Sequence, residues 1–306
     1  MMQPNTHAPI ILFVYNRPWH TRQTIEALQR NELASESELF IYSDAAKSSK
    51  ANAAVQEARD YIYSVSGFKK ITIIERKYNW GLADSIIDGV TSIVNKYGRV
   101  IVLEDDLVTS PFFLKFMNDA LSFYENEKRV WHISGWSYPI EIEELTDVFL
   151  WRVMNCWGWA TWSDRWCHYE KNVDETLALF DDEMIRQFDL DNSGIFWNQI
   201  LANKKGCLNT WAIFWYASIF LKKGFCLNPS VSFVQNIGHD GSGVHCGVIS
   251  DEVRNLNMKG SCEFPLAVNE YILIREKIEQ YYKTRKNTFA ARLYNMYLRI
   301  KRKVVG

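Results

Sequence analysis

The first third of the chain alternates short apolar runs with longer amphipathic stretches, and this alternation constrains the fold more than any other feature. The apolar runs are residues 10–15, 39–42, 71–74 and 100–103. Helical spacing follows the first three runs, beginning at Pro18, at about Ala51 and before Ile86. Proline suits the first turn of a helix because its fixed φ angle is helical. Four strands alternating with three helices predict an α/β fold with a mostly parallel, doubly wound sheet.

Polar side chains follow the apolar runs at the points where the strands should end. They are Asn16-Arg17, Ser43-Asp44, Asn79 and Glu104-Asp105-Asp106. Ligands of parallel α/β sheets bind at the carboxyl ends of the strands, and these ends share one edge of the sheet. We therefore expect these clusters to converge on one binding site.

The acids Glu104, Asp105 and Asp106 directly follow the fourth apolar run. Like charges in one turn repel each other unless a cation or hydrogen-bond donors neutralise them. Hard oxygen ligands suit Mn2+ or Mg2+, which bridge carboxylates to a substrate pyrophosphate. An isolated acidic triplet is often only an exposed turn. The position of this one on the same edge as Arg17 and Asp44 favours a metal site.

The sequence pattern changes near residue 130. Beyond that point, aromatic strand-like segments at 130–134 and 149–153 replace the regular alternation of strands and helices. The organisation we expect is an α/β half over residues 1–130, a second half of the same domain over 131–250, and a C-terminal helical extension over 251–306.

Charge and cysteine content restrict the class of partner. The 35 Lys and Arg nearly balance the 36 Asp and Glu, so no overall field recruits nucleic acid and an anionic ligand must be met by local groups. The six cysteines include no C-x-x-C pair, and the first eight residues are polar. Both features favour free, buried thiols in a cytoplasmic protein over a disulfide or zinc framework. The most apolar helical stretch, 211–221, is too short to span a bilayer.

The C-terminal end is basic and amphipathic. Apolar side chains there alternate with Arg292, Arg299, Lys301, Arg302 and Lys303. Such a helix can lie on an anionic membrane surface, although a plain solvated helix is the commoner explanation. A peripheral contact with the inner face of a membrane is therefore a secondary expectation.

Several segments together resemble one known enzyme family. They are residues 10–17, residues 41–44, Val100–Leu107 with Ser110-Pro111-Phe112-Phe113, and the W-G-W-A-T-W run at 157–162. They resemble the inverting N-acetylglucosaminyltransferase I type glycosyltransferases and their bacterial relatives, over roughly residues 8–247. The resemblance implies the GT-A fold and a nucleotide-sugar donor bound by residues 1–130, with the acceptor side in residues 131–250.

The resemblance also implies a role for each side chain along the sheet edge. Arg17 would meet the diphosphate, Asp44 the base, Glu104 the donor sugar, Asp105 the ribose and Asp106 the metal. Asn79 lies on the same edge and belongs to the expected donor site. The residue types fit these roles, because a guanidinium binds phosphate bidentately and a metal neutralises charge on a leaving diphosphate.

The glycine-rich segment 236–245 predicts a loop that closes over phosphates. In similar enzymes a late histidine completes the metal shell or contacts the diphosphate, and we expect His245 rather than His239 to do so. A merely structural loop is the alternative. The tryptophans at 151–166 either form a wall for sugar rings or pack the core, and Trp157 and Trp159 are the ones expected to reach the site.

The catalytic base is the point where the chain departs from the family pattern. Many relatives have an aspartate at the position of Ala212, and alanine cannot deprotonate an acceptor hydroxyl. We expect Asp240 to take this role beside Glu104 at the donor sugar, with Asp164 and Glu170 as further candidates for the base. A different mechanism or a loss of activity are the alternatives.

The sequence thus predicts a glycosyltransferase that needs Mn2+ or Mg2+ and transfers a hexosyl or N-acetylhexosaminyl group, with a UDP-sugar as the expected donor. The acceptor would be a hydroxyl of a cell-surface glycan or of a lipid-linked precursor, and the anomeric configuration would invert. One alternative is a sugar nucleotidyltransferase, although the turn at residues 16–19 lacks the glycines of that class. The other is a non-catalytic protein that binds nucleotides or glycans, which Ala212 makes plausible.

Overall fold

The computed structural model describes residues 7–140, 146–241 and 255–287. Its centre is an eight-stranded sheet with the order β3-β2-β1-β4-β8-β6-β9-β7. The strands are β1 (Ile10–Val14), β2 (Glu38–Ser43), β3 (Lys70–Glu75), β4 (Arg99–Glu104), β6 (Val130–Ser134), β7 (Val148–Trp151), β8 (Trp159–Trp162) and β9 (Phe225–Pro229). A separate two-stranded ribbon pairs β5 (Leu107–Thr109) with β10 (Val234–Asn236).

The sheet is mixed but mostly parallel. β1 runs parallel to β2 and β4, and β2 runs parallel to β3. β8 is antiparallel to both β4 and β6, while β9 is parallel to β6 and β7 is antiparallel to β9. The predicted α/β class with a mostly parallel central sheet is confirmed. Strands β6 to β9, beyond residue 130, extend the same sheet, whereas β10 pairs with β5 in the separate ribbon.

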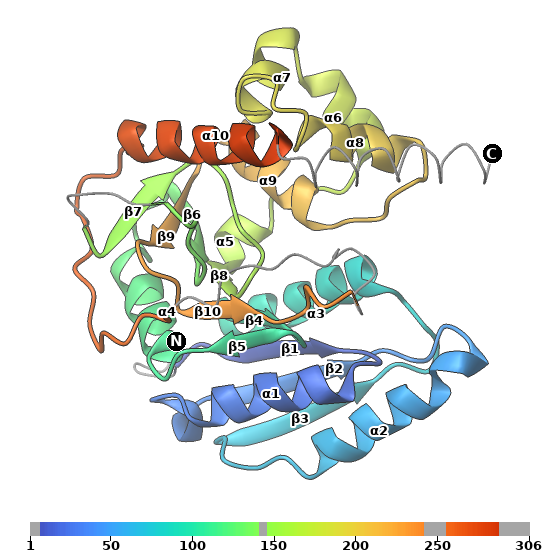
Figure 1. Ribbon diagram of the computed structural model, residues 1–306. Coiled ribbons are helices and arrows are strands. Elements are labelled where there is room, and N and C mark those ends of the chain that lie inside the picture. Colours follow the sequence, from blue (N-terminus) through green and yellow to red (C-terminus); the bar gives the residue numbers. More distant parts are fainter. Residues whose placement is uncertain (1–6, 141–145, 242–254, 288–306) are drawn as a thin grey trace.

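Helices cover both faces of this sheet (Figure 1). The α-helices of the described residues are α1 (Pro18–Gln29), α2 (Asn52–Tyr63), α3 (Leu82–Tyr97), α4 (Phe113–Phe123), α5 (Ser163–Trp166), α6 (Val173–Leu179), α7 (Asp182–Phe188), α8 (Trp197–Lys204), α9 (Ala212–Leu221) and α10 (Ile272–Asn287). Alternate residues of β1 serve the two faces: Ile10 and Leu12 pack with α1, whereas Ile11 and Phe13 pack with α3. Because β1 is buried on both faces, it is a continuous apolar run.

The β5–β10 ribbon joins two segments that are far apart in the sequence, at the edge of the sheet where β4 ends. β5 begins directly after the acidic turn, and β10 pairs with it so that Asn236 lies opposite Leu107. The backbone N–H of Ile237 then donates to the carbonyl of Asp106 at 2.8 Å. This pairing places the segment after β10 directly over the end of β4.

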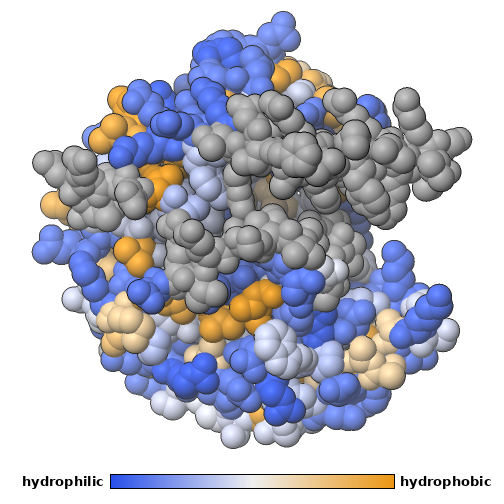
Figure 2. Space-filling view, viewed as in Figure 1, coloured by the Kyte–Doolittle hydropathy of each residue, from blue (hydrophilic) through white to orange (hydrophobic). Residues whose placement is uncertain are grey.

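The surface agrees with the balanced charge of the sequence. Figure 2 shows a face that is mostly hydrophilic, with apolar side chains gathered in a few small groups. Among the described residues, no helix is both long enough and apolar enough to cross a membrane. The basic residues between Arg292 and Lys303 lie outside the described residues.

The five cysteines within the described ranges are free. Cys226 is buried, and Cys156 and Cys262 are partly so. The expectation of buried thiols is wrong for Cys167 and Cys207, which are exposed because they follow the last turns of α5 and α8 at the surface.

Candidate functional site

The acidic turn and Arg17 meet at the carboxyl ends of β4 and β1. Arg17 lies between β1 and α1, and its Nη2 atom is 2.8 Å from Oδ2 of Asp106 and also forms a short ion pair with Asp105. The hydroxyl of Thr24 in α1 donates to the carbonyl of Asp105 and accepts from the N–H of Leu107. Thr24 of α1 therefore holds the backbone of the turn, and Arg17, directly before α1, supplies the positive charge next to its carboxylates.

The turn carries more negative charge than Arg17 balances. Burial, with Asp106 and Asp105 adding to it, raises the pKa of Glu104 to about 8, against the opposing effect of Arg17. Burial also raises the pKa of Asp105. Burial alone would lower the pKa of the Arg17 guanidinium, but the Asp105 and Asp106 carboxylates raise it overall. At neutral pH Glu104 is therefore largely protonated, and the carboxylates of Asp105 and Asp106 face the single positive charge of Arg17. One negative charge remains that a further cation would neutralise.

The segment after β10 covers the turn closely. The N–H of Gly238 donates to Oδ1 of Asn236, and a Cβ atom at Gly238 would lie 2.2 Å from Oδ2 of Asp106 and 2.9 Å from Nη1 of Arg17. Only glycine lets the backbone approach so closely. The glycine-rich segment was predicted to form a loop over this edge, and its described part, up to residue 241, takes that place.

Asp240 lies close to a residue that the sequence analysis missed. Oδ2 of Asp240 lies 3.1 Å from Nε2 of His20, in the first turn of α1. His20 is buried, while the side chain of Asp240 is half-exposed. The sequence held one signal for His20: it stands two residues after Pro18, on the same edge as Arg17.

An aromatic group adjoins the covering segment. The Trp157 ring meets His239 edge-on at 5.3 Å and meets Trp136 edge-on at 4.9 Å. Both ring nitrogens of His239 are buried, and neither has a hydrogen-bond partner among the described residues. The structure therefore brings Trp157 to the covering segment. His245, the predicted metal ligand, lies outside the described residues.

Trp159 is in a different environment from Trp157. It is 1% exposed, and its ring stacks between His132 at 5.4 Å and Trp211 at 5.1 Å. With neighbours on both faces, it has no surface to offer a ligand. The assignment of Trp159 to the donor site is therefore corrected: it is a core residue.

Asp44 and Asn79 fasten a loop to the edge of the sheet. One Asp44 carboxylate oxygen accepts the N–H groups of Ala45 and Trp80, and the other accepts the N–H of Gly81 and the amide of Asn79. The same Asn79 amide also donates to the carbonyl of Ala45. A carboxylate has about four lone-pair positions, so these donors fill the acceptor positions of the Asp44 carboxylate. Asp44 thus lies on the predicted edge, but its contacts hold the loop at residues 79–81.

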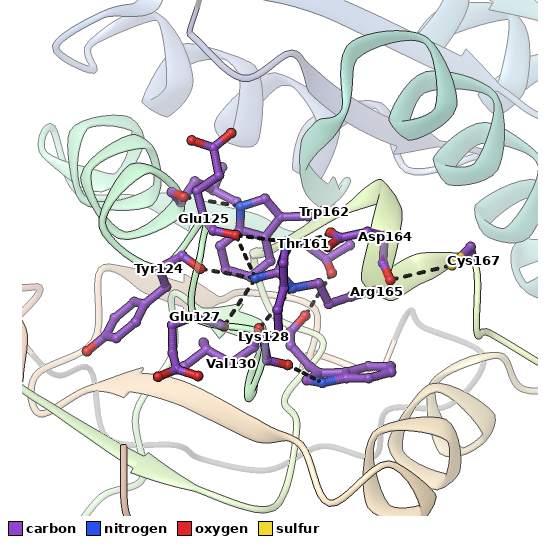
Figure 3. A network of polar contacts seen from close by, with 12 residues as sticks. Tyr124, Glu125, Glu127, Lys128, Val130, Thr161, Trp162, Asp164, Arg165 and Cys167 are labelled. Atoms are coloured by element: carbon purple, nitrogen blue, oxygen red, sulfur yellow. Dashed lines mark hydrogen bonds and ion pairs between the residues drawn. The ribbon is translucent and has the colours of Figure 1, made fainter. Parts of the chain in front are cut away.

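Two of the candidate bases lie away from the acidic turn. Asp164 follows β8, whose end pairs with the start of β4, so it stands at the opposite end of the sheet from Glu104. Its carboxylate pairs with Lys128 and Arg165 (Figure 3). Glu170 is exposed, and its backbone N–H donates to Ser218 on α9. Asp240 is the candidate base that the structure brings to the turn.

The donor chemistry of the acidic turn suits a hard divalent cation. Its side chains offer carboxylate oxygens with unbalanced negative charge, and Asp105 and Asp106 are each 5% exposed. Within the described ranges, however, no group of three or more His, Cys, Asp or Glu side chains is already arranged as a ligand set. Arg17 is the cation that contacts Asp105 and Asp106 in this arrangement.

Comparisons with known proteins add little to this picture. No protein-family model matches the chain, and no curated protein sequence matches it. The crystal structure of S. aureus TarS is similar with a TM-score of 0.30 and 14% identity, over 42% of this chain and 21% of that one. The mannosyltransferase PcManGT from Pyrobaculum calidifontis, in complex with GDP-Man and Mn2+, gives a TM-score of 0.29 and 15% identity, over 45% and 39%. The chain spans less than half of either protein.

Proposed function

We propose that the chain is a metal-dependent glycosyltransferase of the GT-A type that transfers a sugar from a UDP-sugar with inversion. One observation carries the proposal: Arg17, the acids 104–106, Gly238 and Asp240 come from three distant segments and meet at the carboxyl ends of β1 and β4. An edge of this kind is where α/β sheets bind nucleotides. The resemblance of the acidic turn and of the W-G-W-A-T-W run to the N-acetylglucosaminyltransferase I type supports the same function.

The proposed roles follow from the chemistry of each side chain. Arg17 binds the diphosphate through its forked N–H groups, and Asp106 holds Mn2+ or Mg2+. The bound metal supplies charge neutralisation on the leaving diphosphate. Glu104 and Asp105 contact the donor sugar and ribose, and Trp157 provides an aromatic surface next to them. Residues 1–130 bind the donor, residues 131–250 face the acceptor, and residues 251–306 form an extension.

Asp240 is the proposed base. Its carboxylate takes the proton of the acceptor hydroxyl as that oxygen bonds to the anomeric carbon. The bond from this carbon to the diphosphate oxygen breaks, and the electron pair leaves with UDP. Attack from the side opposite the leaving group inverts the anomeric configuration. The half-exposed position of Asp240 leaves its carboxylate accessible to an acceptor.

A panel of nucleotide sugars tests the proposal. With Mn2+ present, one donor should raise the melting temperature, since a ligand stabilises the folded state that it binds. The same donor should slowly release UDP without an acceptor, which a binding protein or a nucleotidyltransferase would not do. Asp106→Ala should abolish the Mn2+ dependence of donor binding, whereas the control Asp119→Asn, in an exposed pair with Lys115, should not. Binding without turnover would favour a non-catalytic binding protein.

Turnover of the variants tests the base. Asp240→Asn should lower kcat by about 100-fold or more, with little change in donor affinity, because a general base acts on the acceptor proton. Unchanged turnover would remove Asp240 from this role.

A further inference from the structure

The acidic turn has its own counter-ion. Among the described residues, the ion pairs of both Asp105 and Asp106 are made with Arg17, through one nitrogen atom of its guanidinium. The carboxylates are 5% exposed, and the Arg17 side chain is 17% exposed, so water screens these charges weakly. The guanidinium thus occupies the position relative to the carboxylates that a bound cation would take.

Space at Asp106 is limited as well. Its Oδ2 atom accepts a hydrogen bond from Arg17 at 2.8 Å and lies against the backbone of Gly238. A divalent cation needs a lone pair of its ligand at about 2.0–2.6 Å. Oδ2 of Asp106 therefore cannot serve such a cation while Arg17 and Gly238 keep these positions.

Arg17 also has unused donor capacity. Its Nη1 atom is buried and has no hydrogen-bond partner within the part of the chain that the structure describes. Buried donors without partners are rare, because desolvation without a hydrogen bond is costly. An anion placed beside Nη1 would give this atom a partner and would also compete with Asp106 for the guanidinium.

We infer that Arg17 is a built-in counter-ion of the acidic turn, and that it must leave Oδ2 of Asp106 before a divalent cation binds this oxygen. The guanidinium then pairs with the diphosphate that arrives with the cation. The cation displaces Arg17 from Asp106 and so frees the guanidinium for the diphosphate, while the diphosphate holds Arg17 away from Asp106. Cation and diphosphate consequently bind with positive cooperativity. The inference rests on the proposed function for the assignment of Asp106 as the metal ligand.

Binding of Mn2+ alone tests the inference without any measurement of activity. Free Mn2+ is measured by electron paramagnetic resonance as it is titrated into the protein without nucleotide. Arg17→Gln should bind Mn2+ about tenfold more tightly than the wild type, since one competing charge is gone. With saturating Mn2+, the same variant should bind UDP more weakly. The control Arg22→Gln, in an exposed pair with Glu26 on the same helix, should change neither affinity.

An equal or weaker Mn2+ affinity of Arg17→Gln would overturn the inference. If this variant does not fold, Arg17→Lys keeps one charge with fewer donors and should still bind Mn2+ more tightly than the wild type. Tighter Mn2+ binding without turnover of any donor would leave the inference standing and remove the proposed function. Metal-dependent turnover by the wild type, with an unchanged Mn2+ affinity in both variants, would support the proposed function and overturn the inference about Arg17.

Discussion

Nε2 of His20 lies 3.1 Å from Oδ2 of Asp240, and this contact ties the first turn of α1 to the segment after β10. The imidazole is buried, whereas the carboxylate is half-exposed. The rigid partner is therefore His20, and Asp240 is the group that it orients. In the proposed mechanism His20 is a positioning residue, since it acts on the acceptor only through Asp240.

Replacing His20 should lower kcat more than it changes the donor KM. His20→Ala removes the partner that orients the carboxylate, and loss of orientation at a reacting group costs rate. We expect a fall in kcat of about tenfold, with partial recovery in His20→Gln, which keeps a side-chain donor. Steady-state kinetics with the identified donor give the comparison. A purely structural role would instead lower the melting temperature equally in both variants and leave kcat of the folded protein unchanged.

Gly238→Ala should weaken the binding of UDP with Mn2+ by about tenfold or more. The new Cβ would lie 2.2 Å from Oδ2 of Asp106, so either the covering segment or the Arg17 pair must shift. Overpacking of this kind typically costs about 1–3 kcal/mol of stability. Isothermal titration calorimetry measures the affinity. The matched control is Gly260→Ala, where the nearest atom to the new Cβ is on Phe112 at 3.3 Å. Equal affinities in the two variants would contradict the prediction.

Asp44→Asn should loosen the loop at residues 79–81. The asparagine has one acceptor oxygen in place of two, so at least one of the N–H groups of Trp80 and Gly81 loses its partner. Such a loss typically costs about 1–3 kcal/mol. Urea denaturation should show this decrease and no comparable decrease for Asp60→Asn, whose carboxylate accepts from Gln56 on the exposed face of α2. If Asp44 instead served only to bind the base, donor affinity would fall while stability stayed constant.

The parallel half of the fold was predictable because its strands are buried on both faces. A buried parallel strand must be apolar along its whole length, so residues 10–14 and 100–103 stand out in the sequence. The ends of such strands share one edge, which brought Arg17 to the acidic turn without any knowledge of tertiary contacts. The second half has mixed strand directions, and its pairing is set by contacts between segments far apart in the chain.

The side-chain environments were harder to predict. Trp157 and Trp159 are two residues apart, and regular strand alternation would put them on one face. Gly158 has a φ angle of 63° and directly precedes β8, so the strand geometry does not extend back to Trp157. Trp157 is half-buried at the site, and Trp159 is in the core. The contact between His20 and Asp240 joins segments that are far apart in the chain, so no local sequence pattern predicts it. The family resemblance assigned Arg17 to the diphosphate alone, whereas the structure shows it paired with Asp105 and Asp106 of the acidic turn.

The core histidine His132 should make stability depend on pH. Its Nδ1 atom accepts from Nε1 of Trp215, and its Nε2 atom lies 2.9 Å from the carbonyl of Asn155. Burial lowers its pKa from 6.5 to about 3, against the opposing effect of that carbonyl. The unfolded chain therefore binds the proton more readily, and the contribution of His132 is complete above pH 6.5 and is lost as the pH falls towards 3.

Comparison of the wild type with His132→Gln isolates the effect of His132, because the two proteins have all other titrating groups in common. Between pH 6.5 and pH 5 the wild type should lose about 2 kcal/mol more of its free energy of unfolding than the variant does. Urea denaturation at both pH values gives the difference. Parallel losses in the two proteins would show that His132 does not titrate on unfolding.

Arg165 should be a large contributor to stability that has no part in the proposed chemistry. Its guanidinium is buried, donates to the carbonyls of Tyr124, Glu125, Glu127 and Val130, and lies 4.3 Å from the centre of the Trp162 ring (Figure 3). These carbonyls follow α4, so the side chain closes the end of that helix.

Arg165→Met should cost about 3–5 kcal/mol, because it leaves buried carbonyls without donors and Asp164 without one of its partners. Arg165→Lys should cost less, since an ammonium group reaches fewer acceptors. Urea denaturation measures both, and Arg186→Gln, in an exposed pair with Glu183, should have little effect. UDP affinity should stay unchanged in the folded Arg165 variants, because Arg165 lies at the end of β4 opposite the acidic turn. A loss of stability no greater than that of the Arg186 control would show that water replaces the guanidinium at these carbonyls.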